Sequence, residues 1–376
     1  MHIDAVELVH LKLPLAKPRA TALGEVTSIE TVVARLASGE LSGWGEVAPG
    51  AAPTGGEEWA GGVYACLCRW LAPALVGQSI ESGDELTERL APVRGNRHGK
   101  AALDLAWWDL VARDRQQPLR EVLAAPERPI RLAVALDLPI ADGEPSIDRL
   151  IEQVGRSFEM GYAHVTLWLR PGWDLEVIRA VRQMFPTEPI RVDCDGHYGS
   201  AQMEMFYRFG DFALEAIEQP LDADDLVAHA MLAEQIHTPV WLDQSITSPS
   251  RLEQAIDLGA AAGVNLRPDQ CGGLTAALSM HEACVTADLA CSMSIGPRSA
   301  IGQGAALALA AKDNYQPAAE LYSPETLLAE DFAPPPNVHR DAEGVLSVSS
   351  SDLPGIGFEP DVAMLRRLSV AREVIR

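Results

Sequence analysis

The run "IRVDC" at residues 190–194 is a short apolar stretch that ends in an acidic side chain, Asp193. Two later apolar runs end in the same way, with Glu218 in "AIEQP" and Asp243 in "VWLDQ". The three acids follow one another at equal intervals of 25 residues, about the length of one strand, one helix and their connections. This repeat predicts buried parallel strands joined by crossover helices.

Eight such apolar runs alternate with amphipathic helical patterns from about residue 130 to about residue 320. A count of eight favours a closed (β/α)-barrel, a modified TIM barrel, over an open doubly wound sheet. The predicted fold class is therefore α/β. The runs are "IRLAVAL" at 130–136, "HVTLWL" at 164–169, "IRVDC" at 190–194, "ALEAIEQP" at 213–220, "PVWLDQS" at 239–245, "AGVNLRP" at 262–268, "LACSMS" at 289–294 and "AAELYS" at 318–323.

The residues on either side of the barrel pattern read differently. The first 50 or so alternate as antiparallel strands do, and helical patterns follow them. Strand and turn signals return near the C-terminus, which we expect to pack on the first module. We predict an α+β capping domain at 1–125, the barrel at 126–325 and a C-terminal segment at 326–376 that returns to the cap.

Composition narrows the class of protein. The formal net charge of -23 opposes binding to nucleic acid or to an anionic membrane, and no apolar stretch is long enough to span a bilayer. The six cysteines show no paired spacing for zinc or disulfides. The opening residues lack the pattern of a secretory signal, so we expect a cytoplasmic protein.

The three acids at strand ends predict a metal site. In a parallel barrel the carboxyl ends of the strands meet at one rim, so Asp193, Glu218 and Asp243 would converge there. Three carboxylates so close together need neutralising, and oxygen ligands suit Mg²⁺. The alternative is that each acid only caps the following helix, which any single Asp can do.

With these residues in hand, the chain resembles the enolase superfamily, in its muconate-lactonizing subgroup, and within that the o-succinylbenzoate synthases and N-acylamino acid racemases. The resemblance covers nearly the whole chain and implies a capped barrel with Mg²⁺ held by Asp193, Glu218 and Asp243. The motifs that carry it are "GWGEVAP" at 43–49, "GNRHGKAALDLAWWDLVAR" at 95–113, "RPGWDLEVIRAVR" at 170–182, "IEQPL" at 217–221, "LDQSITSP" at 242–249 and the glycine pair at 272–273.

The resemblance also implies a substrate carboxylate on the metal, an enediolate formed by loss of the α-proton, and two lysine bases. This chain departs from that pattern. Thr166 and Trp168 stand at the Lys-x-Lys positions, and Arg267 stands at the sixth-strand lysine. Threonine and tryptophan cannot take a proton at neutral pH, and arginine stays protonated, so racemisation by two lysines is not expected.

Two further positions differ from the family pattern. Arg298 stands where the synthase group has a glutamate, and Gln244 replaces the acid that usually follows the third ligand. The His-Asp pair of the mandelate racemase subgroup is not available as a substitute, because it would need an Asp at Arg267 and a His near Gly296.

The arginines suggest an anion site. If Arg267 and Arg298 both face the mouth of the barrel, they could grip carboxylate or phosphate oxygens. The alternative is that both pair with local acids such as Asp269. Trp168 and Thr166 would contact the substrate, although Trp168 could instead fill the upper layer of the barrel.

Three residues remain as candidate bases: Asp195, Asp269 and His197. A carboxylate beside Mg²⁺ is usually too acidic to serve, so we expect Asp195 to orient the site instead. Histidine is a residue type that commonly serves as a general base, but His197 could be an ordinary loop histidine. We predict Arg267, Arg298, Asp269 and His197 as catalytic residues, and Thr166, Trp168 and Asp195 as substrate contacts.

Two functions are compatible with these residues. The first is a divergent Mg²⁺-dependent lyase or isomerase acting on a small carboxylate-containing molecule, by elimination rather than two-lysine racemisation. The second is a non-catalytic descendant that binds a carboxylate or phosphate ligand. We expect a homo-oligomer, and we expect specificity to depend on residues 17–26 and 50–57.

Overall fold

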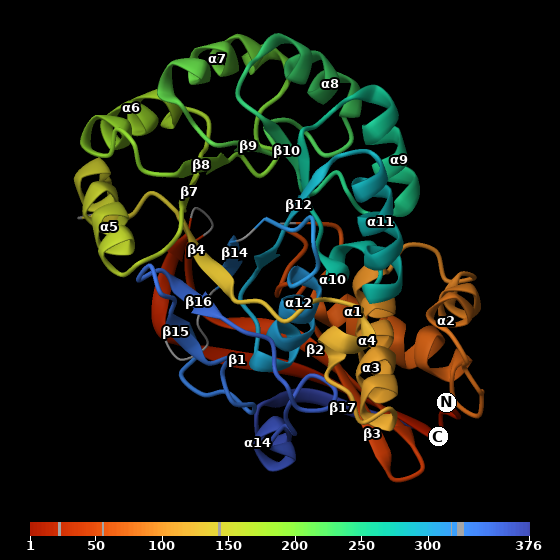
Figure 1. Cartoon of the computed structure of the whole chain (residues 1–376). Helices are drawn as coiled ribbons and strands as arrows, with labels where there is room; N and C mark the ends of the chain where they lie inside the picture. Colours follow the sequence, from red (N-terminus) through yellow and green to blue (C-terminus); the bar gives the residue numbers. More distant parts are fainter. Residues whose placement is uncertain (22–23, 55, 142–143, 317, 322–326) are drawn as a thin grey trace.

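The computed structural model describes residues 1–21, 24–54, 56–141, 144–316, 318–321 and 327–376. An antiparallel sheet with helices lies beside a ring of parallel strands that is surrounded by helices (Figure 1). The predicted barrel with an α+β cap is therefore confirmed. The expected domain boundary at 325 falls outside the described residues, and the division into three ranges stays a prediction.

All eight predicted strands are present in the barrel, and they pair with their neighbours in parallel. The seventh is split at Met293, and its first half pairs with the sixth strand while its second half pairs with the eighth. This one segment therefore closes the ring. The strands are β4 (Ile130–Leu136), β7 (Val165–Trp168), β8 (Ile190–Asp193), β9 (Ile217–Glu218), β10 (Val240–Leu242), β11 (Gly263–Asn265), the pair β12 (Ala290–Ser292) and β13 (Ser294–Ile295), and β14 (Ala318–Leu321).

Helices cover the outside of the ring (Figure 1). Several begin at a side chain that accepts a hydrogen bond from a first-turn N–H, among them Ser146, Asp225 and Ser248. No helix within the described residues has the length and apolar character needed to cross a membrane. The helices are α5 (Ile147–Glu159), α6 (Asp174–Met184), α7 (Met203–Tyr207), α8 (Leu226–Gln235), α9 (Pro249–Leu258), α10 (Pro268–Cys271), α11 (Leu274–Thr286) and α12 (Ala300–Ala310), with 3₁₀ turns at Ser200–Gln202 and Arg208–Phe212 and a small hairpin, β5 (Ile140–Ala141) and β6 (Glu144–Pro145).

Both ends of the chain form the sheet of the cap. Strands β1 (Ala5–Thr21), β2 (Gly24–Ser38) and β3 (Leu41–Val47) form the expected meander, and β17 (Ser369–Ile375) pairs with β1. The rest of the C-terminal segment includes helix α14 (Val362–Arg367) and a hairpin that pairs with barrel strand β4. That hairpin is β15 (Val338–Arg340) and β16 (Leu346–Val348).

Helix α3 (Arg97–Asp114) lies directly against β3, and two glycines make this close approach possible. A Cβ on Gly45 would lie 2.3 Å from the carbonyl oxygen of Ala102, and one on Gly43 would lie 2.1 Å from that of Ala106. The glycines of the "GWGEVAP" motif therefore serve packing. The other cap helices are α1 (Ala60–Cys66), which continues in a π-helical turn (Leu67–Leu71) and a 3₁₀ turn (Ala72–Ala74), α2 (Gly83–Leu90) and α4 (Leu119–Val122).

The hydrophobic core forms two clusters. One is continuous from the cap sheet and α3 to β11, β12 and α12, and the other lies between β7 and β8 and helices α5 and α6. The cap is thus joined through its core to one side of the barrel.

Two buried acids of the cap hold helices of the barrel at their N-termini. Glu46 of β3 accepts hydrogen bonds from the backbone N–H groups of Ser299 (3.2 Å) and Gly302 (3.0 Å) at the start of α12. Asp104 of α3 accepts from the N–H (3.1 Å) and hydroxyl (2.5 Å) of Thr275 at the start of α11. These contacts place the cap against the carboxyl end of the barrel and suit the positive end of each helix.

Burial raises the pKa of Asp104 to about 7, against the lowering effect of its bonds to Thr275. The folded state therefore binds more protons than the unfolded state between about pH 4 and pH 7, and stability falls as pH rises through this window. We expect the unfolding free energy of the wild type relative to Asp104→Asn to fall by about 2–4 kcal/mol over that window. Urea unfolding at several pH values measures it. Asp114→Asn at the exposed end of α3 controls for the lost charge, and an equal slope in wild type and Asp104→Asn would contradict the prediction.

Candidate active site

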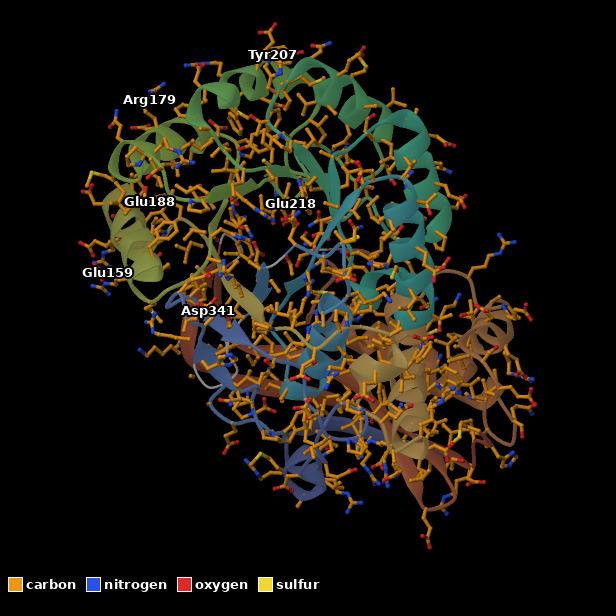
Figure 2. The ribbon with its side chains drawn as sticks, viewed as in Figure 1. Glu159, Arg179, Glu188, Tyr207, Glu218 and Asp341 are labelled. Carbon is orange, nitrogen blue, oxygen red and sulfur yellow. The ribbon has the colours of Figure 1, made fainter. Side chains whose placement is uncertain are left out.

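The three predicted metal ligands lie at neighbouring strand ends. Asp193 ends β8, Glu218 ends β9 and Asp243 directly follows β10, and the register pairs Asp193 with Glu218. All three line one cavity of about 250 Å³. Figure 2 shows Glu218 inside the ring, whereas the labelled Arg179 and Tyr207 lie on the outer rim.

Gln219 holds the backbone at Asp243, the third of these acids. This wholly buried side chain accepts hydrogen bonds from the backbone N–H groups of Asp243 (2.9 Å) and Ser245 (3.1 Å) and donates to the hydroxyl of Ser245 (2.8 Å). Its backbone φ of 37° is left-handed, a conformation that a non-glycine residue adopts only when its surroundings hold it. The Gln of "IEQP" is therefore a positioning residue for the next strand end, a role that the sequence did not reveal.

The three carboxylates repel one another. Enclosure by protein, followed by repulsion from Glu218 and Asp243, raises the pKa of Asp193 well above its usual range. Burial, then repulsion from Asp243, raises the pKa of Glu218 to about 8. Burial raises the pKa of Asp243 to about 6, against the lowering effect of Arg267. A cation at this place would relieve the repulsion.

The donor chemistry fits a hard divalent cation. Oδ1 of Asp243 is buried without a hydrogen-bond partner, and three carboxylates provide the oxygen ligands that Mg²⁺ prefers. As the side chains stand, however, the described part of the chain holds no group of three or more His, Cys, Asp or Glu arranged to hold a metal ion. The nearest positive charge is that of Arg267, whose Nη2 lies 2.7 Å from Oδ2 of Asp243.

Both predicted arginines pair with acids, as the alternative interpretation had it. Arg267 binds Asp243, and Arg298 donates to Asp269 across 2.8 Å with both side chains about 95% buried. Burial alone would raise the pKa of Asp269, but Arg298, His98 and Arg267 lower it to about 2. Arg267 lines the cavity, whereas Arg298 and Asp269 do not, so the expected two-arginine anion site is not assembled.

His197 lies at the cavity with one nitrogen already engaged. Its Nδ1 is 3.0 Å from the carbonyl oxygen of Cys194, which can only accept, so Nδ1 carries the hydrogen. The neutral ring therefore leaves Nε2 unprotonated. Asp195, also at the cavity, donates its N–H to Asp193 (2.9 Å) and accepts from Gln244 (2.6 Å), which suits an orienting role.

Trp168 and Thr166, two of the predicted substrate contacts, differ in their surroundings. Trp168 lines the cavity and pairs in register with Asp193. Thr166 is buried and donates its hydroxyl to Glu320 at the end of the eighth strand. Glu320 also accepts from the hydroxyl of Ser294 (2.9 Å) and lines the cavity. The sequence analysis missed Glu320, although the strand-end rule applied to "AAEL" would have found it.

Two other predictions can be placed. The expected specificity segments at 17–26 and 50–57 each include residues outside the described ranges, 22–23 and 55. A second hollow, of about 340 Å³, is lined by Arg35, Arg113 and Glu359 among others and by none of the predicted site residues.

A capped parallel barrel with a row of acids at its strand ends defines a class of enzyme scaffold. Similarity to known protein families identifies the class. Residues 3–124 match the mandelate racemase / muconate lactonizing enzyme N-terminal domain, and residues 149–364 match the enolase C-terminal domain-like family. The chain belongs to the enolase superfamily, whose members generally use Mg²⁺.

Its relatives lie in the group that the sequence motifs indicated. An o-succinylbenzoate synthase of Geobacillus kaustophilus is 30% identical over 98% of this chain and 96% of its own length. An N-succinylamino acid racemase of Thermus thermophilus is 35% identical over 75% of each chain. A solved enolase-superfamily protein of Listeria innocua superposes with a TM-score of 0.91 at 27% identity, covering 100% of this chain and 99% of that one.

Replacing Gln219 with leucine would leave the buried N–H groups of Asp243 and Ser245 without a partner. Since each unpaired buried group costs about 1–3 kcal/mol, we expect Gln219→Leu to lower the unfolding free energy by about 2–5 kcal/mol. Urea unfolding at a fixed pH measures the loss. Gln153→Leu, at an exposed position of α5, is the matched control. Equal stability of the two variants would show that Gln219 does not hold the site.

Proposed function

We propose that the chain is a Mg²⁺-dependent enzyme that removes the α-proton of a small carboxylate-containing substrate and completes an elimination, as a lyase or dehydratase. The observation that carries this proposal is the composition of the cavity. Its described lining brings Asp193, Glu218 and Asp243 together with His197 and contains no lysine. The names of the relatives, built on succinylbenzoate and succinylamino acids, support a carboxylate substrate.

Asp193, Glu218 and Asp243 would hold the metal. A Mg²⁺ ion bound there would supply positive charge toward the oxygens of the substrate carboxylate, where negative charge accumulates as the α-proton leaves. Gln219 and Asp195 keep two of these carboxylates in place through the hydrogen bonds described above. Trp168 provides an apolar wall where the family pattern has a lysine, so it narrows the cavity and excludes water from one face of the substrate.

We assign His197 as the base. Its Nε2 accepts the α-proton while the C–H bonding pair moves toward the carboxylate. That pair then forms the double bond to the β-carbon, and the group on the β-carbon departs with its bonding pair and takes up the proton held by His197, which restores the base. Elimination is complete after one proton transfer from carbon. Racemisation requires a second acid on the opposite face to return the proton, and Arg267 stays protonated too firmly to exchange one. The buried pair of Arg298 and Asp269 lies outside the cavity lining, and we assign it a positioning role.

The test is hydrogen exchange and elimination in deuterated water with Mg²⁺, followed by NMR on a panel of N-succinylamino acids and β-hydroxy acids. We expect α-proton loss with at least one substrate, abolished in Asp193→Asn and lowered about 100-fold or more in His197→Asn. His237→Asn, at an exposed position, is the matched control.

Two outcomes would contradict this proposal. Ligand-dependent thermal stabilisation without exchange or product from any substrate would favour the non-catalytic binder. Full activity in His197→Asn would place the base elsewhere.

A further inference from the structure

Arg267 is fixed at both ends of its guanidinium group. Nη2 donates to Oδ2 of Asp243 at 2.7 Å, and Nε donates to Oε1 of Gln270 at 3.1 Å. The Asp243 side chain is 4% exposed and that of Arg267 is 19% exposed, so water screens this ion pair only weakly. The pair is therefore a strong local interaction rather than a surface contact.

The position of this charge matters because of its neighbours. The cavity lining carries five carboxylates, and its arginines are Arg170 and Arg267. Arg170 forms its ion pair with Asp137 at 3.3 Å rather than with Asp193, Glu218 or Asp243, which we call the acidic trio. The charge of Arg267 instead attracts four acids, which are Asp243, Asp269, Glu218 and Asp193, and three of these are the side chains that a cation would need. Its guanidinium and a divalent cation would meet the same carboxylates.

The two carboxylate oxygens of Asp243 differ in their partners. Oδ2 holds the guanidinium, while Oδ1 is buried with no partner. A carboxylate whose second oxygen is already bonded to a cationic donor is a weaker ligand, because its charge is shared and a second cation beside it is repelled.

We propose that Arg267 is a counter-ion for Asp193, Glu218 and Asp243, and that its guanidinium competes with Mg²⁺ for the charge of Asp243. The arginine stabilises the barrel mouth when metal is scarce and lowers its affinity for Mg²⁺, because the charge of Asp243 is shared with the guanidinium on Oδ2 even though Oδ1 is left to bind the metal. This inference rests on the proposed metal site and assigns to the residue at the sixth strand a role in setting metal affinity rather than in proton transfer.

Isothermal titration of the whole chain with Mg²⁺, after treatment with EDTA and dialysis, measures the competition. Arg267→Met removes the charge at similar length, and we expect it to bind Mg²⁺ at least tenfold more tightly than the wild type. Arg267→Lys keeps the charge and should lie much nearer the wild type. Arg170→Met removes an equal charge from the same cavity but leaves the Asp243 ion pair intact, and it should change the affinity less than about threefold.

Thermal unfolding provides a second readout. Without Mg²⁺, Arg267→Met leaves Asp243 unpaired and should melt below the wild type, and saturating Mg²⁺ should raise its melting temperature more than that of the wild type. Should Arg267→Met fold only with Mg²⁺, that also supports the proposal, and Arg267→Lys still permits the comparison in EDTA.

The experiment distinguishes failure of the role proposed for Arg267 from failure of the proposed metal site. Equal Mg²⁺ affinity in wild type and Arg267→Met, or an equal gain in Arg170→Met, would overturn the role of Arg267 while leaving the metal site standing. No Mg²⁺ binding by any variant would overturn the metal site itself and with it the proposed function.

Discussion

The repulsion between three carboxylates at one rim is the constraint on which the site depends. Parallel register sets Asp193 and Glu218 side by side, and the next strand adds Asp243. Burial makes each negative charge more costly, so a positive charge at this rim would stabilise the fold. Members of the superfamily generally use Mg²⁺. In this chain the guanidinium of Arg267 already meets one of the three.

Arg267, Thr166 and Arg298 each have an acid as their partner. Arg267 places a fixed positive charge beside Asp243, and the hydroxyl of Thr166 donates to Glu320. Arg298 forms a separate buried ion pair with Asp269. Each of these side chains is a partner for an acid at the rim or beside it. Asp243, Glu320 and Asp269 are thus paired with cationic or hydroxyl donors.

The cap contributes to this arrangement through hydrogen bonds as well as through its packing. Glu46 binds the start of α12 one residue after Arg298, and Asp104 binds the start of α11 just beyond α10 and the glycine pair. Asp104 lies at a close approach that a side chain on the neighbouring glycine would block, since a Cβ on Gly273 would lie 2.3 Å from Oδ1 of Asp104. The motifs "GWGEVAP" and "ALDLAWWD" thus hold the loops that form the site, although they contribute no residue to the described cavity lining.

The sequence by itself determined the barrel, its eight strands and the acids at three strand ends. These follow from short-range periodicity and from a spacing that repeats, and both can be read along one chain. Tertiary structure alone decided which partners the charges take. Arg267 and Asp243 lie 24 residues apart, Thr166 and Glu320 lie 154 apart, and Gln219 reaches the next strand end. Such pairings depend on side-chain directions within a closed ring, where every strand end faces several others, and no pattern along the sequence specifies which of them will meet.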